Sequence, residues 1–198
     1  SSHVGDLTKC LERLKELMNW DEGMRLDIGG NKIRAKGMAC FWKTSDSPTD
    51  AISGALLTFN TDGSINLNCG AVEMGPAMKT TAAQLLAEKM KMDINRIHVY
   101  LDVNTQTSPE HWKTVASMTT FMVGRAVLRA AEDVINQLKS LAGVVLRCSP
   151  EDLDVGGEKV FLKQDPTIYV AFADLVKGYK YPNGNGVEGQ ILGGGALS

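Results

Sequence analysis

The sequence predicts an α+β fold in which mixed sheets pack against long helices. Two long helical patterns, over residues 78–92 and 115–141, alternate with short β-patterned runs. The order strand, helix, strand, helix is typical of a layered sheet that is covered by helices. With 198 residues, of which 43% are hydrophobic, the chain is long enough to bury a core in one domain or in two small lobes.

The first predicted element is a helix over residues 6–18, where leucines recur at helical spacing after an acidic start. Trp20 is expected to close the end of this helix, and residues 32–42 alternate into an extended run. An amphipathic helix buries its apolar stripe against the rest of the molecule. The side chains expected to point inward are Leu7, Leu11, Leu14 and Met18.

The central part of the chain predicts a hairpin followed by the two long helices. Residues 54–60 and 64–72 flank Thr61-Asp62-Gly63, where Asp-Gly accepts the positive φ of a tight turn. The helix over residues 78–92 leads to a strand within residues 94–103 and then to the longest helix. That helix carries apolar residues at core spacing, namely Val115, Met118, Met122, Ala126, Ala130, Val134 and Leu138.

The last third of the chain predicts shorter elements. Residues 149–153 indicate a capped turn of helix, residues 158–162 a short strand, and residues 167–176 a strand that leads into a helix. From about residue 182 the chain is rich in Gly and lacks apolar side chains, so order is expected to fail without a partner domain. Residues 1–198 are therefore interpreted as one domain with a weakly supported Gly-rich tail.

Composition excludes several classes of protein. The net charge is −2 and the basic residues are scattered among acids, which argues against nucleic-acid binding. No apolar run approaches the ~20 residues of a membrane span, and no signal-peptide pattern opens the chain. The four cysteines, Cys10, Cys40, Cys69 and Cys148, are far apart without a C-x-x-C motif. Buried, reduced thiols in a cytoplasmic chain are expected rather than disulfides or a zinc site.

The most informative stretch is residues 70–81, where a strand pattern breaks at small residues and restarts as a helix. The small residues of the Gly75-Pro76-Ala77 turn allow the backbone to approach a bound ligand closely. The helix that begins near Ala77 or Met78 offers unpaired N–H groups and the positive end of a helix dipole. This pattern predicts a backbone cradle for an anion. A strand, a Gly-Pro turn and a helix are also common in α/β proteins without any ligand, so a purely structural role is the alternative.

A second helix start follows. Residues 111–117 are expected to open the longest helix with hydroxyl side chains in its first turn. If the fold brings the two helix starts together, both N-termini would converge on one phosphate-bearing ligand.

The segments GAVEMGPAMKTTAAQLLAE, IHVYLDV and NTQTSPEHWKTVASMTTFMVGRAVLRAAEDV occur in this order. Together they resemble the molybdenum-binding subunit of the xanthine dehydrogenase and aldehyde oxidase family, bacterial members above all. The resemblance extends to KGMACFWKTSDSP and to the final YPNGNGVEGQILGGGALS. It implies an internal fragment of the molybdopterin-binding region of a molybdenum hydroxylase.

The resemblance also implies chemistry and partners. Members of the family hold molybdenum on a pyranopterin (molybdopterin), often as a cytosine dinucleotide in bacteria, and oxidise N-heterocycles or aldehydes with water-derived oxygen. Iron–sulfur centres and FAD lie on other domains or subunits, alongside the remaining domains of the molybdenum subunit. The catalytic Glu of the family lies well downstream, so the resemblance implies neither a catalytic residue nor a metal ligand here. The fragment alone is expected to be inactive and to bind no molybdenum.

Cofactor contacts are implied at two segments. Glu73 to Ala77 matches a family segment that usually reads Glu-Met-Gly-Gln-Gly, which implies contacts from Met74, Gly75, Pro76 and Ala77. Pro76 replaces the Gln and removes both an amide and a backbone N–H, and Ala77 adds a methyl group where Gly is usual.

The second segment, residues 114–119, matches the helix start at which small and hydroxyl residues contact the pterin or its phosphates. The contacts implied there come from Ala116, Ser117, Met118 and Thr119. Met118 stands where bacterial relatives often carry Arg. These departures leave open a degenerate structural or assembly domain of the same fold that no longer binds the cofactor. An unrelated phosphate-binding enzyme is disfavoured because no P-loop, dinucleotide or nucleophile-elbow motif is present.

Three further polar residues are interpreted as structural. His98 lies in a β-patterned run and is expected to be a sheet histidine. His111 is expected to be a surface cap, with a stacking or substrate-channel role left open. Glu73 lies beside the predicted anion cradle, where a carboxylate would repel a phosphate, so it is assigned a structural hydrogen-bonding role.

Overall fold

The computed structural model describes residues 5–41 and 50–197, and the chain divides into two compact units, residues 1–46 and 47–198. The first unit contains α1 (Leu7–Leu17), a 3₁₀ turn (Trp20–Glu22) and a hairpin of β1 (Arg25–Asp27) and β2 (Ile33–Ala35). The predicted helix is confirmed, with Asp6 as its N-cap accepting from the Lys9 N–H at 3.0 Å.

The apolar stripe of α1 is not buried as expected. Leu7 remains 53% exposed and Leu14 42%, and none of the residues of α1 is buried. The few elements of this unit cannot enclose an apolar core. A polar contact joins them instead, because the Lys36 ammonium donates to the Asn19 carbonyl at 2.5 Å and lies 3.3 Å from the Glu22 carboxylate. The predicted extended run is a strand only at β2, and its last residue, 42, lies outside the described residues.

The second unit is built on a four-stranded sheet with the order β11-β3-β4-β5. The strands are β3 (Ser53–Phe59), β4 (Ile65–Cys69), β5 (Ile97–Tyr100) and β11 (Leu192–Leu197). The predicted hairpin of β3 and β4 is confirmed, and its turn places Gly63 at φ +84° with its N–H donating to the Asn60 carbonyl at 3.0 Å. In contrast, β4 and β5 run parallel.

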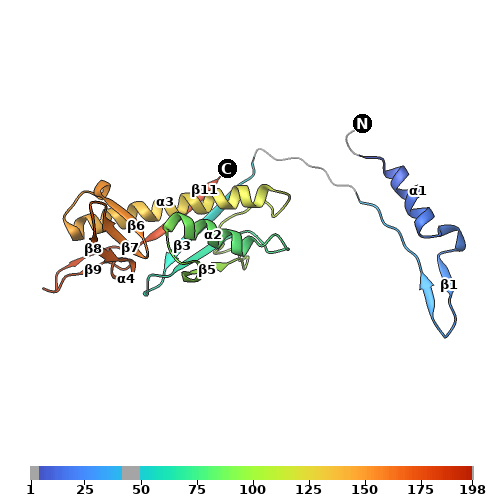
Figure 1. Cartoon of the computed structure of the whole chain (residues 1–198), viewed down its shortest axis with the longest axis horizontal. Helices are drawn as coiled ribbons and strands as arrows, with labels where there is room; N and C mark the ends of the chain where they lie inside the picture. The colour runs from blue at the N-terminus through green and yellow to red at the C-terminus, as the bar shows by residue number, and fades with distance from the viewer. Residues whose placement is uncertain (1–4, 42–49, 198) are drawn as a thin grey trace. The chain divides into compact units, whose positions relative to one another are not determined.

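The helices α2 (Met78–Met90) and α3 (Met118–Leu146) pack together on one face of this sheet (Figure 1). Leu57 and Leu67 of the sheet and Leu86 of α2 are fully buried in the shared core. The predicted α2 is confirmed. The core spacing of α3 is confirmed from Met122 to Leu138, but the helix begins at Met118, so the expected start over residues 111–117 is wrong.

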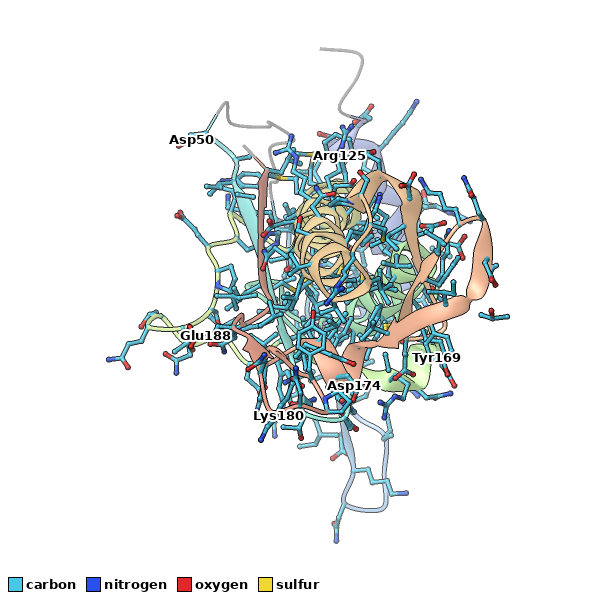
Figure 2. All side chains as sticks on the ribbon, turned by 90° about the vertical axis from the view of Figure 1, so that its left-hand side faces the viewer. Asp50, Arg125, Tyr169, Asp174, Lys180 and Glu188 are labelled. Carbon is cyan, nitrogen blue, oxygen red and sulfur yellow. The ribbon has the colours of Figure 1, made fainter. Side chains whose placement is uncertain are left out.

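A three-stranded sheet lies at the carboxyl end of α3 (Figure 1). It contains β6 (Leu153–Gly156), β7 (Lys159–Leu162) and β8 (Asp165–Ala171), and a 3₁₀ turn (Pro150–Asp152) capped by Ser149 leads into it. The short helix α4 (Phe172–Leu175) and the hairpin of β9 (Tyr179–Lys180) and β10 (Gly186–Val187) follow. The predicted turn, strand and strand-to-helix pattern are confirmed, whereas β6 is an addition. Figure 2 looks nearly along α3, with Asp174, Lys180 and Glu188 at the periphery.

The Gly-rich tail is ordered, contrary to the expectation from its composition. Strand β11 pairs with β3 from Leu192 opposite Thr58 to Leu197 opposite Ser53. A Cβ at Gly193 would collide with Val134, and one at Gly195 would collide with the Ala126 carbonyl of α3. The glycines therefore allow the strand to approach the helix backbone closely, and Ile191, just before the strand, is buried in the core.

Candidate functional site

The two predicted segments meet at one edge of the four-stranded sheet. Because β4 and β5 are parallel, their carboxyl ends lie at the same edge, and α2 and α3 follow these two strands in the chain. The Val72 N–H donates to the Thr114 Oγ1 at 3.0 Å, which joins the loop before α2 to the loop before α3. Gly70 lies so close to the second loop that a Cβ there would collide with the Pro109 carbonyl. The fold thus brings the two helix starts together.

Three N–H groups at the start of α2 are already occupied by the carboxylate of Glu73. The Oε1 of Glu73 accepts from the Gly75 N–H at 3.0 Å and from the Ala77 N–H at 3.1 Å, and its Oε2 accepts from the Lys79 N–H at 3.3 Å. Partial desolvation raises the pKa of Glu73, but hydrogen bonds from the N–H groups of Lys79, Gly75, Ala77 and Met78 outweigh it, and the pKa lies below its usual range. The structural role assigned to Glu73 is confirmed.

The start of α3 is open by comparison. The Met118 N–H donates to the Val115 carbonyl at 3.2 Å, and the Val115 N–H donates to the Thr119 hydroxyl at 3.1 Å. The Ser117 side chain makes no capping hydrogen bond. Within residues 5–41 and 50–197, the N–H groups of Thr119 and Thr120 have no hydrogen-bond acceptor. These donors are free to meet an oxygen atom of a ligand.

Backbone strain is present at both helix starts. Ala77 has φ +57° and Ala116 has φ +47°, in the left-handed region that disfavours residues with a Cβ by about 1–2 kcal/mol. Non-glycine residues held in this region gather at functional sites, where the surrounding structure compensates for the strain. Of the eight residues predicted to contact a cofactor, Thr119 is buried and Met118 half-buried, and the exposed ones are Met74, Gly75, Pro76, Ala77, Ala116 and Ser117.

His111 differs from its expected position as a surface cap. Its Nδ1 lies 2.8 Å from the Oγ of the buried Ser53, and its buried Nε2 has no partner in the part of the chain that the structure describes. Burial lowers the pKa of His111, and the Lys113 carbonyl opposes this only in part. The neutral imidazole therefore fastens the loop before α3 to β3. His98 lies exposed on β5.

A family model described as a molybdopterin cofactor-binding domain matches residues 13–192. The chain belongs to this molybdopterin-binding family. The match takes in both segments that meet at the sheet edge, so the predicted resemblance to the molybdenum-binding subunit of molybdenum hydroxylases is confirmed.

The relatives of this chain are longer proteins, and the chain matches only a part of each. The xanthine dehydrogenase molybdenum-binding subunit of Escherichia coli O157:H7 is 28% identical over 174 residues, which are 85% of this chain and 23% of that relative. The xanthine dehydrogenase of Oryza sativa subsp. japonica is 29% identical over 122 residues, 57% of this chain and 9% of that enzyme. The crystal structure of quinoline 2-oxidoreductase from Pseudomonas putida 86 shares the fold, with a TM-score of 0.62 at 17% identity over 76% of this chain and 19% of that one. The chain spans less than a quarter of the length of each relative.

Three further features concern the cysteines, the groups that could bind a metal ion, and the helices that could cross a membrane. All four cysteines are free thiols, but the expected burial is wrong for Cys10 and Cys40, which are exposed. Cys69 is buried, and burial raises its pKa. Among the described residues, no three His, Cys, Asp or Glu side chains gather where they could hold a metal ion. None of the helices in residues 5–41 and 50–197 combines the length and apolar character needed to cross a membrane.

Sequence reasoning identified the two segments that meet at the sheet edge but missed two of their features. It did not identify the carboxylate of Glu73 as the group that occupies the start of α2. The signal was present, since an acidic residue lies two positions before Gly75 and four before the N-cap Ala77. It also placed the start of α3 too early, because the hydroxyls of Thr114 and Thr119 bind loop N–H groups and hold residues 111–117 outside the helix.

Proposed function

We propose that this chain forms one wall of the molybdenum-cofactor site of a xanthine dehydrogenase/aldehyde oxidase-type hydroxylase. The observation that carries the proposal is the meeting of two strained helix starts at one sheet edge in a member of the molybdopterin-binding family. The residues that would hold the cofactor are Met74, Gly75, Pro76, Ala77, Ala116, Ser117, Met118 and Thr119.

The two segments would contribute differently to this wall. At the start of α3, the free N–H groups of Thr119 and Thr120 and the exposed hydroxyl of Ser117 suit the acceptor oxygens of a pterin or its phosphates. At the start of α2, Met74 and Pro76 offer exposed surface, Pro76 has no N–H, and the N–H groups of Gly75 and Ala77 are bound by Glu73. These residues therefore bind and orient the cofactor. When bound, the cofactor supplies the two-electron redox chemistry.

The complete protein is proposed to oxidise an N-heterocycle or an aldehyde with oxygen derived from water. Its cofactor would be molybdopterin, in bacteria as a cytosine dinucleotide. The remaining domains of the molybdenum subunit would complete the site, and iron–sulfur centres and FAD on other domains or subunits would carry the electrons away. We further propose a cytoplasmic protein in which residues 1–198 act as one domain that is inactive alone.

A second candidate function is a degenerate domain kept for structure or assembly. The observation that favours it is local, since the Glu73 carboxylate occupies N–H groups at the start of α2 and Pro76 has no N–H at all. Met118 adds no charge to the second segment.

Metal and pterin analysis of the complete protein from its own host separates the two functions. We expect near-stoichiometric molybdenum in the wild type and in Ser140→Tyr, which changes an exposed residue farther along α3. We expect loss of molybdenum in Ser117→Tyr, because the larger side chain covers the start of α3. A folded wild-type protein without molybdenum would instead support the structural role.

A further inference from the structure

We propose that Glu73 is a positioning residue whose carboxylate acts as an internal anion. It holds the start of α2 in place and excludes an external carboxylate or phosphate from it. An anionic group of a ligand is then received at the start of α3. The chemical nature of that ligand rests on the proposed function, whereas the exclusion at α2 does not.

The hydrogen bonds of Glu73 occupy three backbone donors of the turn. Its two carboxylate oxygens receive N–H groups from residues 75, 77 and 79 at 3.0–3.3 Å. Residue 76 is Pro and has no N–H to offer a second anion. The Thr81 N–H is also occupied, since it donates to the Ala77 carbonyl at 2.9 Å. An arriving phosphate would meet both a filled site and a negative charge.

The backbone of the turn is shaped around this carboxylate. Gly75 at φ +111° and Ala77 at φ +57° turn their N–H groups toward the same oxygen, Oε1. Successive N–H groups that point into one concavity form a known kind of anion site, and the positive end of the α2 dipole strengthens it. The strain at Ala77 is therefore compensated by a charge-assisted hydrogen bond from its own N–H.

The start of α3 has no such internal anion. The Thr119 hydroxyl caps the Val115 N–H rather than the helix, and no carboxylate accepts from the first turn of α3 among the described residues. The two helix starts therefore differ in which one can receive a ligand anion. Because the two helix starts lie close together, a ligand anion that reaches this edge of the sheet binds at the start of α3 rather than at the start of α2.

Removing the internal anion should create an anion site that small carboxylates can fill. The experiment uses the full chain as wild type, Glu73→Ala, Glu73→Gln and the control Glu188→Ala, which removes an exposed carboxylate elsewhere (Figure 2). Thermal unfolding midpoints are measured at pH 7 against sodium formate, and separately against inorganic phosphate, with ionic strength held constant by sodium chloride.

Glu73→Ala is expected to unfold about 2–4 °C below wild type and to regain most of that difference in formate, with saturation. Glu73→Gln keeps an acceptor oxygen in place, so it should lose less and respond little to formate. Wild type and Glu188→Ala should show no formate response. An equal response of wild type and Glu73→Ala, or no response of Glu73→Ala, would overturn the proposal.

A second readout covers the case in which Glu73→Ala does not fold. Amide hydrogen exchange at Gly75, Ala77 and Lys79 is expected to be slow in wild type and faster in Glu73→Gln, because a neutral acceptor holds these N–H groups less firmly. Unchanged exchange would contradict the role of Glu73. Neither readout involves molybdenum, so a failure here is distinct from a failure of the proposed cofactor site.

Discussion

The side-chain amide of Gln137 pairs with the backbone of Leu192 as a neighbouring strand would. The Gln137 Nε2 donates to the Leu192 carbonyl at 2.7 Å, and the Leu192 N–H donates to the Gln137 Oε1 at 3.3 Å. One helical turn earlier, Asp133 accepts from the Gly194 N–H at 3.2 Å, and another turn earlier Arg129 donates to the Ala196 carbonyl. Four residues of helix and two of strand both advance by about 6 Å, so three side chains of α3 cover the outer edge of β11.

Gln137→Ala should loosen this edge. The Leu192 N–H and carbonyl lose their partners at a partly solvated position, so we expect the free energy of unfolding to fall by about 1 kcal/mol. Hydrogen exchange at the Leu192 amide should accelerate. Urea unfolding and exchange measurements check this, with Asn136→Ala on the exposed face of α3 as the control. Equal stability of the two variants would show that the amide pair contributes nothing.

Two neighbouring glycines of β11 should respond in opposite ways to the same methyl group. At Gly195 a Cβ would collide with the Ala126 carbonyl and the Ala130 nitrogen, whereas nothing lies within 4 Å of a Cβ at Gly194. We expect Gly195→Ala to lower the free energy of unfolding by about 3 kcal/mol or to displace β11. Gly194→Ala should change it by about 0.5 kcal/mol or less. Similar thermal unfolding midpoints for both variants would contradict the close packing of β11 on α3.

Ala77→Gly should stabilise the chain, which is unusual for this substitution. Removal of the Cβ relieves the left-handed strain, and after the greater entropy of an unfolded Gly is subtracted we expect a gain of about 0.5–1 kcal/mol. Ala87→Gly, within α2, is the matched control and should lower stability by about 1 kcal/mol. Denaturant unfolding measures both. A loss of stability at both positions would mean that Ala77 is not strained.

Asp62 should make the chain sensitive to acid. Hydrogen bonds from the Ser64 hydroxyl and N–H, with further help from Arg96, lower the pKa of Asp62 to about 2. Arg96 lies 3.0 Å from the Asp62 carboxylate and 2.9 Å from that of Glu158, so it joins the β3–β4 turn to the β6–β7 turn. Because the folded pKa lies below the unfolded one, the contribution of Asp62 is full above about pH 4 and is lost as the pH falls toward 2.

The measurement for Asp62 is the unfolding midpoint as a function of pH. Wild type should lose stability more steeply than Asp62→Asn between pH 4 and 2, and the two curves should run parallel above pH 5. Asp174→Asn, which changes an exposed carboxylate elsewhere in the second unit, should follow wild type (Figure 2). If all three curves ran parallel down to pH 2, the proposed contribution of Asp62 to stability would be wrong.

The candidate site was predictable in position but not in detail. Gly75-Pro76-Ala77 and the hydroxyl-rich residues before α3 mark two helix starts by their local chemistry. The contact of the Val72 N–H with Thr114 joins residues far apart in the chain, and the left-handed conformation of Ala116 depends on that surrounding structure. Neither has a signature in a short stretch of sequence.

The sequence by itself determined the α+β fold class, the Asp62-Gly63 hairpin and the two long helices, because turn chemistry and hydrophobic period act over a few residues. The resemblance to molybdenum hydroxylases rests on matching segments of sequence rather than on these patterns. Only the tertiary structure decided that the Gly-rich tail is ordered and that the apolar stripe of α1 is exposed. Composition counts side chains that could fill a core, but Gly193 and Gly195 are ordered by a backbone approach to α3. The stripe of α1 remains exposed because its own unit offers too little surface to cover it.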